Sequence, residues 1–299
     1  MNGMIKTRLL EEAEAMLLKS DEERIQYIRD DRWIGYDKAG EVLEKMTGLL
    51  SHPRILRMPN LLIIARTNNG KTQILRRFQE LNPADDNIGG EAVRVPVVYV
   101  QAPPDPDERR LYSEILNAIF ARYSFSDHPQ KLLDNVKDKF GKIGVKMLLI
   151  DELNNLIVGT TTKQRRFLTV LKQLGNELRI PIVAAGTEEA VRAVQSDPQL
   201  SNRFEPIILP RWALDVNFQR LLATYEQMLP LRNASGLSKK QMAQDIWGRS
   251  EGTIGEAITL VKKAAVLAIE TGTEQIDALS LEKCGYAAPS ARKKRLLEA

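Results

Sequence analysis

Residues 61–73 read LLIIARTNNGKTQ, an apolar run suited to a buried strand followed by a loop that ends in Gly70, Lys71 and Thr72. A phosphate-binding loop has glycine, four free positions, Gly-Lys and then Ser or Thr. Ala65 stands where the first glycine belongs. A loop that leaves a buried strand and opens a helix can aim its backbone N–H groups at phosphate oxygens. The stretch therefore predicts a nucleotide site with one relaxed position, and the alternative is a chance match.

The departure at Ala65 is small in physical terms. Alanine is the least intrusive replacement for glycine if that position has a negative φ. Asn68 and Asn69 tolerate the left-handed backbone that such loops use. In a loop of this kind Lys71 reaches the β- and γ-phosphates, and the Thr72 hydroxyl coordinates Mg²⁺. We interpret Ala65 as a tolerated variant and predict a working site for ATP and Mg²⁺.

Strand-length apolar runs alternate with helical patterns through the first two thirds of the chain. Strands that are apolar on both faces and alternate with helices indicate a parallel sheet covered on both sides. The fold class is therefore α/β. The predicted strands are 61–65, 95–100, 147–150, 181–186 and 207–210, and the helices between them are 71–81, 108–123, 129–141 and 163–178.

Beyond residue 214 the pattern changes to helices alone, which predicts a small helical lid after the sheet. The N-terminal residues also read as one or two helices with mixed charge. We predict four parts, namely an N-terminal helical extension (1–30), an α/β nucleotide-binding core (31–212), a helical lid (213–285) and a basic C-terminal tail (286–299).

The composition excludes several classes of protein. A single cysteine, Cys284, cannot form an internal disulfide framework, and two histidines are too few for a histidine-rich metal site. No apolar run is long enough to span a bilayer, and the amphipathic N-terminus lacks the core of a secretory signal. We expect no membrane partner and a cytoplasmic location. The net charge, 43 − 39 = +4, permits contact with a polyanion without demanding it.

A second motif follows about 80 residues later, in KMLLIDELNNL at 146–156. A buried strand that ends in Asp151 and Glu152 supplies what a nucleotide hydrolase needs beside its phosphate loop. Asp151 would hold the Mg²⁺ shell and Glu152 would polarise the attacking water. Acids are also common where strands exit, but ligands of parallel sheets bind at this carboxyl edge. Paired with the loop, the two acids predict a hydrolytic site.

Two further polar residues lie next to predicted strands: Thr187 follows one, and Arg203 precedes another. Thr187 in PIVAAGTEE could lie between the loop and the acidic strand and sense the γ-phosphate, or it could cap the helix EEAVRAVQ. Arg203 in QLSNRFEP could reach a neighbouring subunit's γ-phosphate, or it could be an ordinary surface arginine. Spacing alone leaves both pairs of alternatives open.

The order of ARTNNGKT, LLIDE, IVAAGT, NRF and EGTIGEA resembles an AAA+ ATPase with a central parallel sheet and a helical lid. More narrowly, the chain resembles the TniB family of transposition ATPases, relatives of TnsC and of the phage Mu target-selection ATPase. The resemblance runs from about residue 20 to 285. Its most specific segment is VPVVYVQAPPDPDE at 95–108.

This resemblance implies functions beyond those that the motifs indicate. Such proteins bind ATP, assemble on double-stranded DNA as homo-oligomeric rings or helical filaments, and present that DNA to a DDE-type transposase. They also meet a TniQ-like targeting factor, and slow ATP hydrolysis disassembles the filament. Two alternatives remain open, namely a helicase loader resembling DnaC or IstB and a non-hydrolysing nucleotide-binding scaffold.

The resemblance also assigns residues by position. Arg109, Arg110 and Ser126 lie where relatives touch the DNA backbone, and Glu256 stands where several relatives carry a sensing arginine, which favours slow hydrolysis. Thr187 is the sensor, Arg203 the finger, and Glu152 and Asp151 the hydrolytic acids. The residues that would contact the nucleotide are Ile34 and Tyr36 at the adenine and Ala65, Arg66, Thr67, Asn68, Asn69, Gly70, Lys71, Thr72 and Gln73 in the loop.

Overall fold

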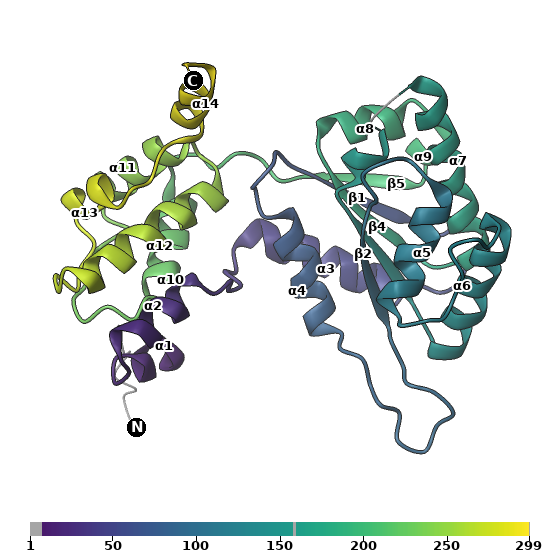
Figure 1. Ribbon diagram of the computed structural model, residues 1–299, viewed down its shortest axis with the longest axis horizontal. Helices are drawn as coiled ribbons and strands as arrows, with labels where there is room; N and C mark the ends of the chain where they lie inside the picture. The colour runs from purple at the N-terminus through teal and green to yellow at the C-terminus, as the bar shows by residue number, and fades with distance from the viewer. Residues whose placement is uncertain (1–7, 158–159, 299) are drawn as a thin grey trace. The chain divides into compact units, whose positions relative to one another are not determined.

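The computed structural model describes residues 8–157 and 160–298, which form two compact units, each with its own hydrophobic core (Figure 1). One unit, the α/β unit, is Asp37–Pro210. The other, the helical unit, combines Met1–Tyr36 with Arg211–Ala299. Each unit is described by itself below.

The α/β unit is built on a five-stranded sheet in the order β2-β3-β4-β1-β5, in which every neighbouring pair is parallel. This confirms the predicted parallel sheet. The pairing of Ile63 with Ala185 and of Tyr99 with Leu149 fixes the register. The strands are β1 (Asn60–Ile64), β2 (Val97–Gln101), β3 (Met147–Asp151), β4 (Ile182–Gly186) and β5 (Phe204–Ile208).

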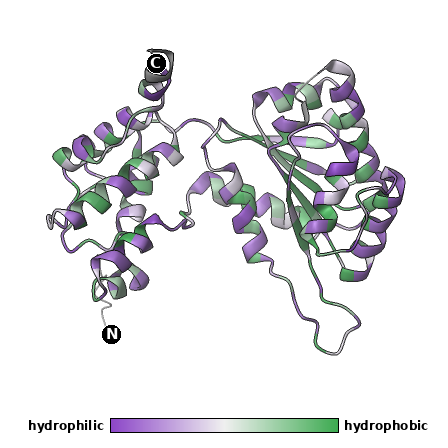
Figure 2. Cartoon of the chain, in the orientation of Figure 1, coloured by the Kyte–Doolittle hydropathy of each residue, from purple (hydrophilic) through white to green (hydrophobic). Residues whose placement is uncertain are grey.

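Helices cover both faces of this sheet, with α3 and α4 on one side and α5, α6 and α7 on the other (Figure 1). Every residue of β1, β3 and β4 is buried, and these strands carry the hydrophobic colour in Figure 2. The helices of the unit are α3 (Asp37–Leu50), α4 (Lys71–Leu81), α5 (Glu108–Ala118), α6 (Pro129–Ile143), α7 (Thr161–Leu178), α8 (Glu188–Gln195) and α9 (Pro198–Ser201), with the 3-10 helix η1 (Leu153–Ile157).

The last strand begins three residues earlier than the predicted 207–210. Its ladder with β1 already pairs Asn60 with Phe204, so hydrogen bonding starts there. Pro206 is tolerated within it because β5 is an edge strand, where a missing N–H donor can face solvent. Helix α9 was not predicted, since four residues are too few for a periodic pattern.

The helical unit packs its helices around a second apolar cluster that includes Phe218, Leu260 and Ile276. Helix α12 is its centre, because α2, α11 and α13 all pack against it. The helices are α1 (Glu11–Met16), α2 (Asp21–Arg29), α10 (Val216–Glu226), α11 (Lys240–Ser250), α12 (Ile254–Glu270), α13 (Ala278–Lys283) and α14 (Pro289–Glu298).

The predicted division at the N-terminus differs from the structure. Residues 1–30 were expected as a separate extension and residues 31–36 as part of the core, but the described residues of both, 8–36, belong to the unit of the C-terminal helices, and residues 1–7 lie outside the described residues. Ile28 and Ile34 are buried in its apolar cluster, and the Leu10 N–H donates to the Gln227 carbonyl at 2.9 Å. This assignment rests on contacts between residues about 200 positions apart, which local patterns cannot reveal.

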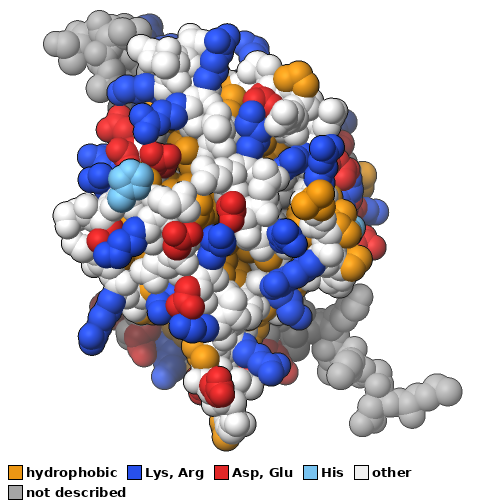
Figure 3. All heavy atoms as spheres, turned by 90° about the vertical axis from the view of Figure 1, so that its right-hand side faces the viewer, with side chains coloured by type: hydrophobic (Ala, Val, Ile, Leu, Met, Phe, Trp, Pro, Cys, Tyr) orange, Lys and Arg blue, Asp and Glu red, His pale blue; other side chains and the backbone are white. Residues whose placement is uncertain are grey.

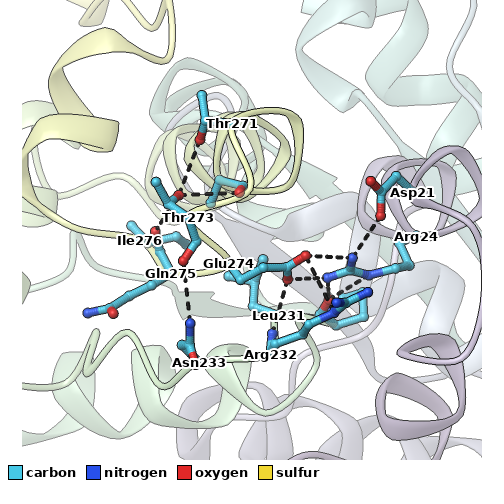
Figure 4. Close-up of polar contacts among 12 residues, drawn as sticks. Asp21, Arg24, Leu231, Arg232, Asn233, Thr271, Thr273, Glu274, Gln275 and Ile276 are labelled. Carbon is cyan, nitrogen blue, oxygen red and sulfur yellow. Dashed lines mark hydrogen bonds and ion pairs between the residues drawn. The ribbon is translucent and has the colours of Figure 1, made fainter.

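A buried arginine ties these distant segments together (Figure 4). Arg24 of α2 is fully buried and donates to the Pro230 carbonyl from Nε at 3.1 Å and from Nη2 at 2.6 Å. Its guanidinium also pairs with both carboxylate oxygens of Glu274 and with Asp21. A buried charge is tolerable when it is paired and fully hydrogen-bonded, as here.

No helix among residues 8–157 and 160–298 combines the length and apolar character needed to cross a membrane.

Candidate functional site

Three adjacent strands deliver the candidate residues to one edge of the sheet. Strand β4 lies between β3 and β1, so the loop after β1, the acids at the end of β3 and Thr187 after β4 leave the sheet side by side. This is the carboxyl edge of a parallel sheet, where ligands bind. The topology therefore brings together the motifs that the sequence placed about 80 and 120 residues apart.

The loop between β1 and α4 has the backbone that its sequence predicts. Gly70 has φ 88° immediately before α4, a left-handed conformation that favours glycine. Asn68 also adopts it, with φ 60°, whereas Asn69 and Ala65 are not among the residues of positive φ. Since a negative φ suits any residue, Ala65 enters the loop without backbone strain. The interpretation of Ala65 as a tolerated variant agrees with this geometry.

Lys71 is the first residue of α4 and is 5% exposed. Its Nζ folds back on the loop and donates to the carbonyl oxygens of Ala65 and Arg66, each at 3.0 Å. Burial lowers the pKa of Lys71, and the nearby carboxylates of Glu152 and Asp151 oppose this shift. The cation is therefore desolvated and bonded to neutral oxygens of its own loop, an arrangement that suits an incoming anion.

Thr72 and Asp151 meet directly. The Thr72 hydroxyl donates to Asp151 Oδ2 at 2.6 Å, and the phenol of Tyr99 donates to the same oxygen at 3.0 Å. Asp151 Oδ1 accepts the Glu152 N–H at 2.8 Å. Burial, together with the Asp151 carboxylate, raises the pKa of Tyr99 to about 12, so the phenol stays a donor. Asp151 is 1% exposed and is held in one orientation by these three bonds.

These donors fit a magnesium nucleotide. A buried carboxylate oxygen and a hydroxyl oxygen in contact are hard ligands of the kind that Mg²⁺ takes from a protein, with the phosphates supplying others. The N-terminus of α4 presents its free N–H groups beside them. Thr72 and Asp151 would hold the ion, and Lys71 with the loop backbone would hold the phosphates.

Glu152 lies one residue beyond Asp151 and has a positive φ of 53°. Its Oε2 accepts a hydrogen bond from the side-chain amide of Asn154 at 3.1 Å. Glu152 thus follows directly after Asp151 at the strand exit, and its role in activating water stays a prediction.

Asn69 connects the loop to the end of β5. It is 3% exposed, and its Nδ2 donates to the carbonyls of Leu209 at 3.1 Å and Pro210 at 3.0 Å. Its Oδ1 is buried and has no hydrogen-bond partner among the described residues. Asn69 was predicted for its backbone conformation, but its side chain instead fixes the loop against the last residues of the α/β unit.

Thr187 does not make the hydrogen bond that the capping alternative requires. It occupies the N-cap position of α8, but its side chain makes no cap hydrogen bond. Its hydroxyl donates to the Glu189 carboxylate instead. Because β4 lies between β3 and β1, Thr187 does stand between the acidic strand and the phosphate loop. Its role as a sensor remains a prediction.

The structure gives other contacts for three further predicted residues. Arg203 precedes β5, and its Nη1 donates to Asn176 Oδ1 at 2.7 Å. A finger acts across subunits, so its role stays a prediction. Ile34 is buried in the helical unit, where Tyr36 stacks edge-on against Trp212 at 5.0 Å between ring centroids. Their contact with adenine also stays a prediction.

Arg109 and Arg110 are exposed on the first turn of α5. They line a hollow of about 530 Å³ with Lys163 and Arg166 of α7. Glu108 pairs with Arg166 at 3.0 Å and Asp105 with Arg110 at 3.6 Å. Lys, Arg, Asp and Glu side chains are likewise intermixed on the face of the α/β unit in Figure 3. Ser126 is exposed in the loop before α6, where its hydroxyl contacts that of Ser124 at 2.9 Å.

Glu256 is paired with basic and phenolic partners within the helical unit. It lies in the first turn of α12, is 8% exposed, and accepts hydrogen bonds from Arg292 at 2.5 Å and from the Tyr286 phenol at 2.8 Å. Arg292 belongs to α14, so the predicted basic tail is at least partly a helix docked on the lid. The backbone N–H of Ser290 also donates to Glu251 at 2.9 Å.

The sequence-based prediction missed Tyr99 and Asn154 as site residues. Tyr99 lies two positions before the end of β2, and a tyrosine in a strand ordinarily reads as a core side chain. Asn154 lies in DELNNL, two residues after Glu152, where a short polar side chain ordinarily indicates a turn. The register of β2 on β3 is what puts Tyr99 beside Asp151.

Solved structures share this fold. The Aeropyrum pernix ORC1 protein in complex with DNA is 16% identical with a TM-score of 0.63, over 91% of this chain and 69% of that one. The A. pernix ORC2 protein is 14% identical with a TM-score of 0.62, over 87% and 71%. The Cdc6p of Pyrobaculum aerophilum is 18% identical with a TM-score of 0.62, over 89% and 70%. At such identities the likeness shows the fold alone, that of the AAA+ ATPases.

Sequence comparison gives the family. No curated protein matches the chain. The model of the family described as "Bacterial TniB protein" matches residues 24–214, which is more than half of the 299 residues and includes both motifs of the site. The matched segment has the parallel sheet, phosphate-loop backbone and paired acids of an AAA+ ATPase, and the chain belongs to the TniB family.

Proposed function

We propose that this protein is a slow ATPase that assembles on double-stranded DNA and regulates transposition. ATP binding would favour a homo-oligomer on DNA, a ring or a helical filament, which recruits or activates a DDE-type transposase. A TniQ-like targeting factor is the second proposed partner. Hydrolysis would end the assembled state.

The observation that carries the proposal is the convergence at the carboxyl edge of the sheet. Lys71 and Thr72 open α4, and Thr72 is bonded to Asp151, the residue that precedes Glu152. Phosphoryl transfer needs positioned cations and a residue that orients the attacking water. All of these groups come from neighbouring strands of one sheet.

Each side chain has a task in hydrolysis. Lys71 would bond to the β- and γ-phosphate oxygens in place of the two loop carbonyls that it now contacts. Glu152 would accept a proton from the attacking water as its oxygen bonds to the γ-phosphorus and the bond to the β-phosphate breaks. Mg²⁺, when bound by Thr72 and Asp151, offsets charge on the phosphates. Arg203 would supply a cation to a neighbouring subunit's site, and Thr187 would respond to the γ-phosphate.

DNA binding is the second half of the proposal. The support is the family, the DNA complex of the A. pernix ORC1 protein, and the exposed Arg109 and Arg110. A net charge of +4 per chain suits modest backbone contacts that repetition along an oligomer multiplies. Contacts to phosphates carry no sequence information, so we expect binding that is tolerant of sequence. Ser126 would add a neutral donor.

Electron microscopy of the protein with duplex DNA tests the proposal as a whole. We expect rings or filaments on DNA of any sequence with ATP and Mg²⁺, and few without nucleotide. Equal DNA retention with and without nucleotide would contradict the proposal. A nucleotide-dependent pull-down of a replicative helicase in preference to a transposase would favour a helicase loader instead.

Glu152→Gln separates binding from chemistry. The amide keeps the shape of the side chain but cannot accept the proton. We expect ATP affinity within about threefold of the parent, hydrolysis reduced at least about a hundredfold, and assemblies that persist on DNA. Turnover at the parental rate would show that Glu152 does not activate water. Hydrolysis too slow to measure in the parent itself would favour a non-hydrolysing scaffold.

A further inference from the structure

The backbone around Glu152 is fixed before any ligand arrives. A positive φ is uncommon for a residue with a side chain, and it persists only where surrounding contacts hold it. Here the Glu152 N–H donates to Asp151 Oδ1 at 2.8 Å, and its carbonyl accepts the Asn155 N–H at 2.9 Å. The backbone is therefore constrained at both ends, but the long side chain still needs a separate restraint.

Asn154 is the residue that contacts this side chain. Its Nδ2 donates to Glu152 Oε2 at 3.1 Å and lies at the outer limit of hydrogen bonding, 3.5 Å, from Asn155 Oδ1. Its Oδ1 is buried without a hydrogen-bond partner among the described residues. An unpaired buried amide oxygen is costly, so an apolar residue would suit stability better at this position.

The turn that carries Asn154 is packed tightly against the sheet. A Cβ added to Gly186, the last residue of β4, would lie 2.8 Å from Ala190 Cβ and 3.3 Å from Leu153 Cβ. Asn154 N would be 3.6 Å away. Glycine at the end of β4 thus lets η1 lie close against β4 and α8. The close packing gives Asn154 a fixed base from which its amide reaches Glu152.

We propose that Asn154 is a positioning residue, whose side-chain amide holds the Glu152 carboxylate in the orientation that activates water. This inference rests on the proposed ATPase function and adds the group that organises its base. A hydrogen bond to a charged acceptor restrains the rotamers of a flexible glutamate, and it is stronger than a bond between neutral groups. The amide cannot titrate, so it provides this restraint at any working pH.

Asn154→Ala compared with Asn155→Ala tests the proposal. Asn155 is the matched control, because it lies in the same turn and its Nδ2 donates to the Ala102 carbonyl at 3.3 Å. For Asn154→Ala we expect kcat to fall about tenfold while ATP affinity and thermal stability change little, since a bond to a charged group is lost. For Asn155→Ala we expect kcat within about threefold of the parent. Equal kcat in Asn154→Ala and the parent would overturn the inference.

A double-mutant cycle excludes a merely structural role. If Asn154 acts through Glu152, then Asn154→Ala added to Glu152→Gln should cause no further loss in single-turnover hydrolysis. A second, independent loss would overturn the inference. Asn154→Asp keeps the shape but replaces the donor with a carboxylate, so it should reduce kcat at least as much as alanine. Hydrolysis absent from the parent would instead defeat the proposed function, which the parental assay shows separately.

Discussion

Two buried cations, one in each unit, have opposite surroundings. In the helical unit Arg24 donates to a backbone carbonyl and pairs with Glu274 and Asp21. In the α/β unit Lys71 donates only to two carbonyls of its own loop, and it forms no ion pair with any described residue. The hydrogen bond to Glu274 raises the pKa of Arg24, whereas burial lowers the pKa of Lys71.

This difference in surroundings distinguishes a cation with a structural task from a cation at a ligand-binding edge. The Arg24 cluster is complete within the chain, so its task is to hold the N-terminal helices on the C-terminal ones. Lys71 is desolvated and forms no ion pair among the described residues, and the buried amide oxygens of Asn69 and Asn154 have no hydrogen-bond partner there. A desolvated lysine at the ligand-binding edge of a parallel sheet is expected where an anionic ligand completes its bonding.

The largest expected effect is on stability, from Arg24→Met. The change leaves the Glu274 carboxylate, 12% exposed, without its main partner. We expect the helical unit to lose about 3–5 kcal/mol of unfolding free energy. Urea titration with tryptophan fluorescence measures this unit specifically, because Trp33, Trp212 and Trp247 all belong to it.

Lys19→Ala is the control for that measurement, because Lys19 belongs to the helical unit. Lys19 pairs with Glu23 of α2 at 3.9 Å, and both side chains are more than half exposed. An exposed pair contributes roughly 0–1 kcal/mol, so stability should change little. A loss below about 1 kcal/mol in Arg24→Met would show that the buried cluster does not hold the helical unit.

Unlike Arg24→Met, Lys71→Met should change ATP affinity rather than stability. It removes a cation whose burial outweighs the attraction of the nearby Glu152 and Asp151 carboxylates, so thermal stability without nucleotide should be unchanged or slightly higher. Affinity for ATP should fall at least about a hundredfold, because bonds between the ammonium and phosphate are lost. Nucleotide-dependent thermal shift measures both quantities in one experiment. A large drop in stability together with unchanged ATP affinity would assign Lys71 a structural role like that of Arg24.

The Arg24 cluster also predicts a pH dependence. The hydrogen bond from Arg24 lowers the pKa of Glu274 below its usual 4.5. Its contribution to stability is therefore complete above pH 4.5 and is lost as the pH falls through the folded-state pKa. The stability of the helical unit should fall there with an extra slope of up to about 1.4 kcal/mol per pH unit. Glu274→Gln should abolish that extra slope, and parallel curves for the two proteins would refute the assignment.

The smallest expected effect is on DNA binding. Arg109→Ala and Arg110→Ala should each weaken DNA affinity a few-fold, and each should reduce the slope of log K against log salt by about 1. Arg77→Ala serves as a control that removes one partly exposed arginine from α4, another helix of the α/β unit. Fluorescence anisotropy with duplexes at several salt concentrations measures the slope. Unchanged slopes in both variants would place the DNA contact elsewhere.

Local patterns predicted much of this molecule. The strand runs and the loop at 65–72 gave the parallel sheet and its ligand-binding edge, because burial of both faces and the Gly70 backbone are encoded by neighbouring residues. The helix at 71–81 was predicted with the observed bounds. What failed depends on tertiary contacts. The pairing of Arg24 with Glu274 spans 250 positions, and Tyr99 meets Asp151 only through the register of two strands.

A titration of ATP with Mg²⁺ into the parent protein tests the central claim most directly, namely that the edge formed by β3, β4 and β1 binds a nucleoside triphosphate. Calorimetry should show saturable binding of one ATP per chain at micromolar concentrations, and Lys71→Met should weaken it at least about a hundredfold. No binding to the parent at millimolar ATP would contradict the account, because the desolvated Lys71 would then have no anion to bind.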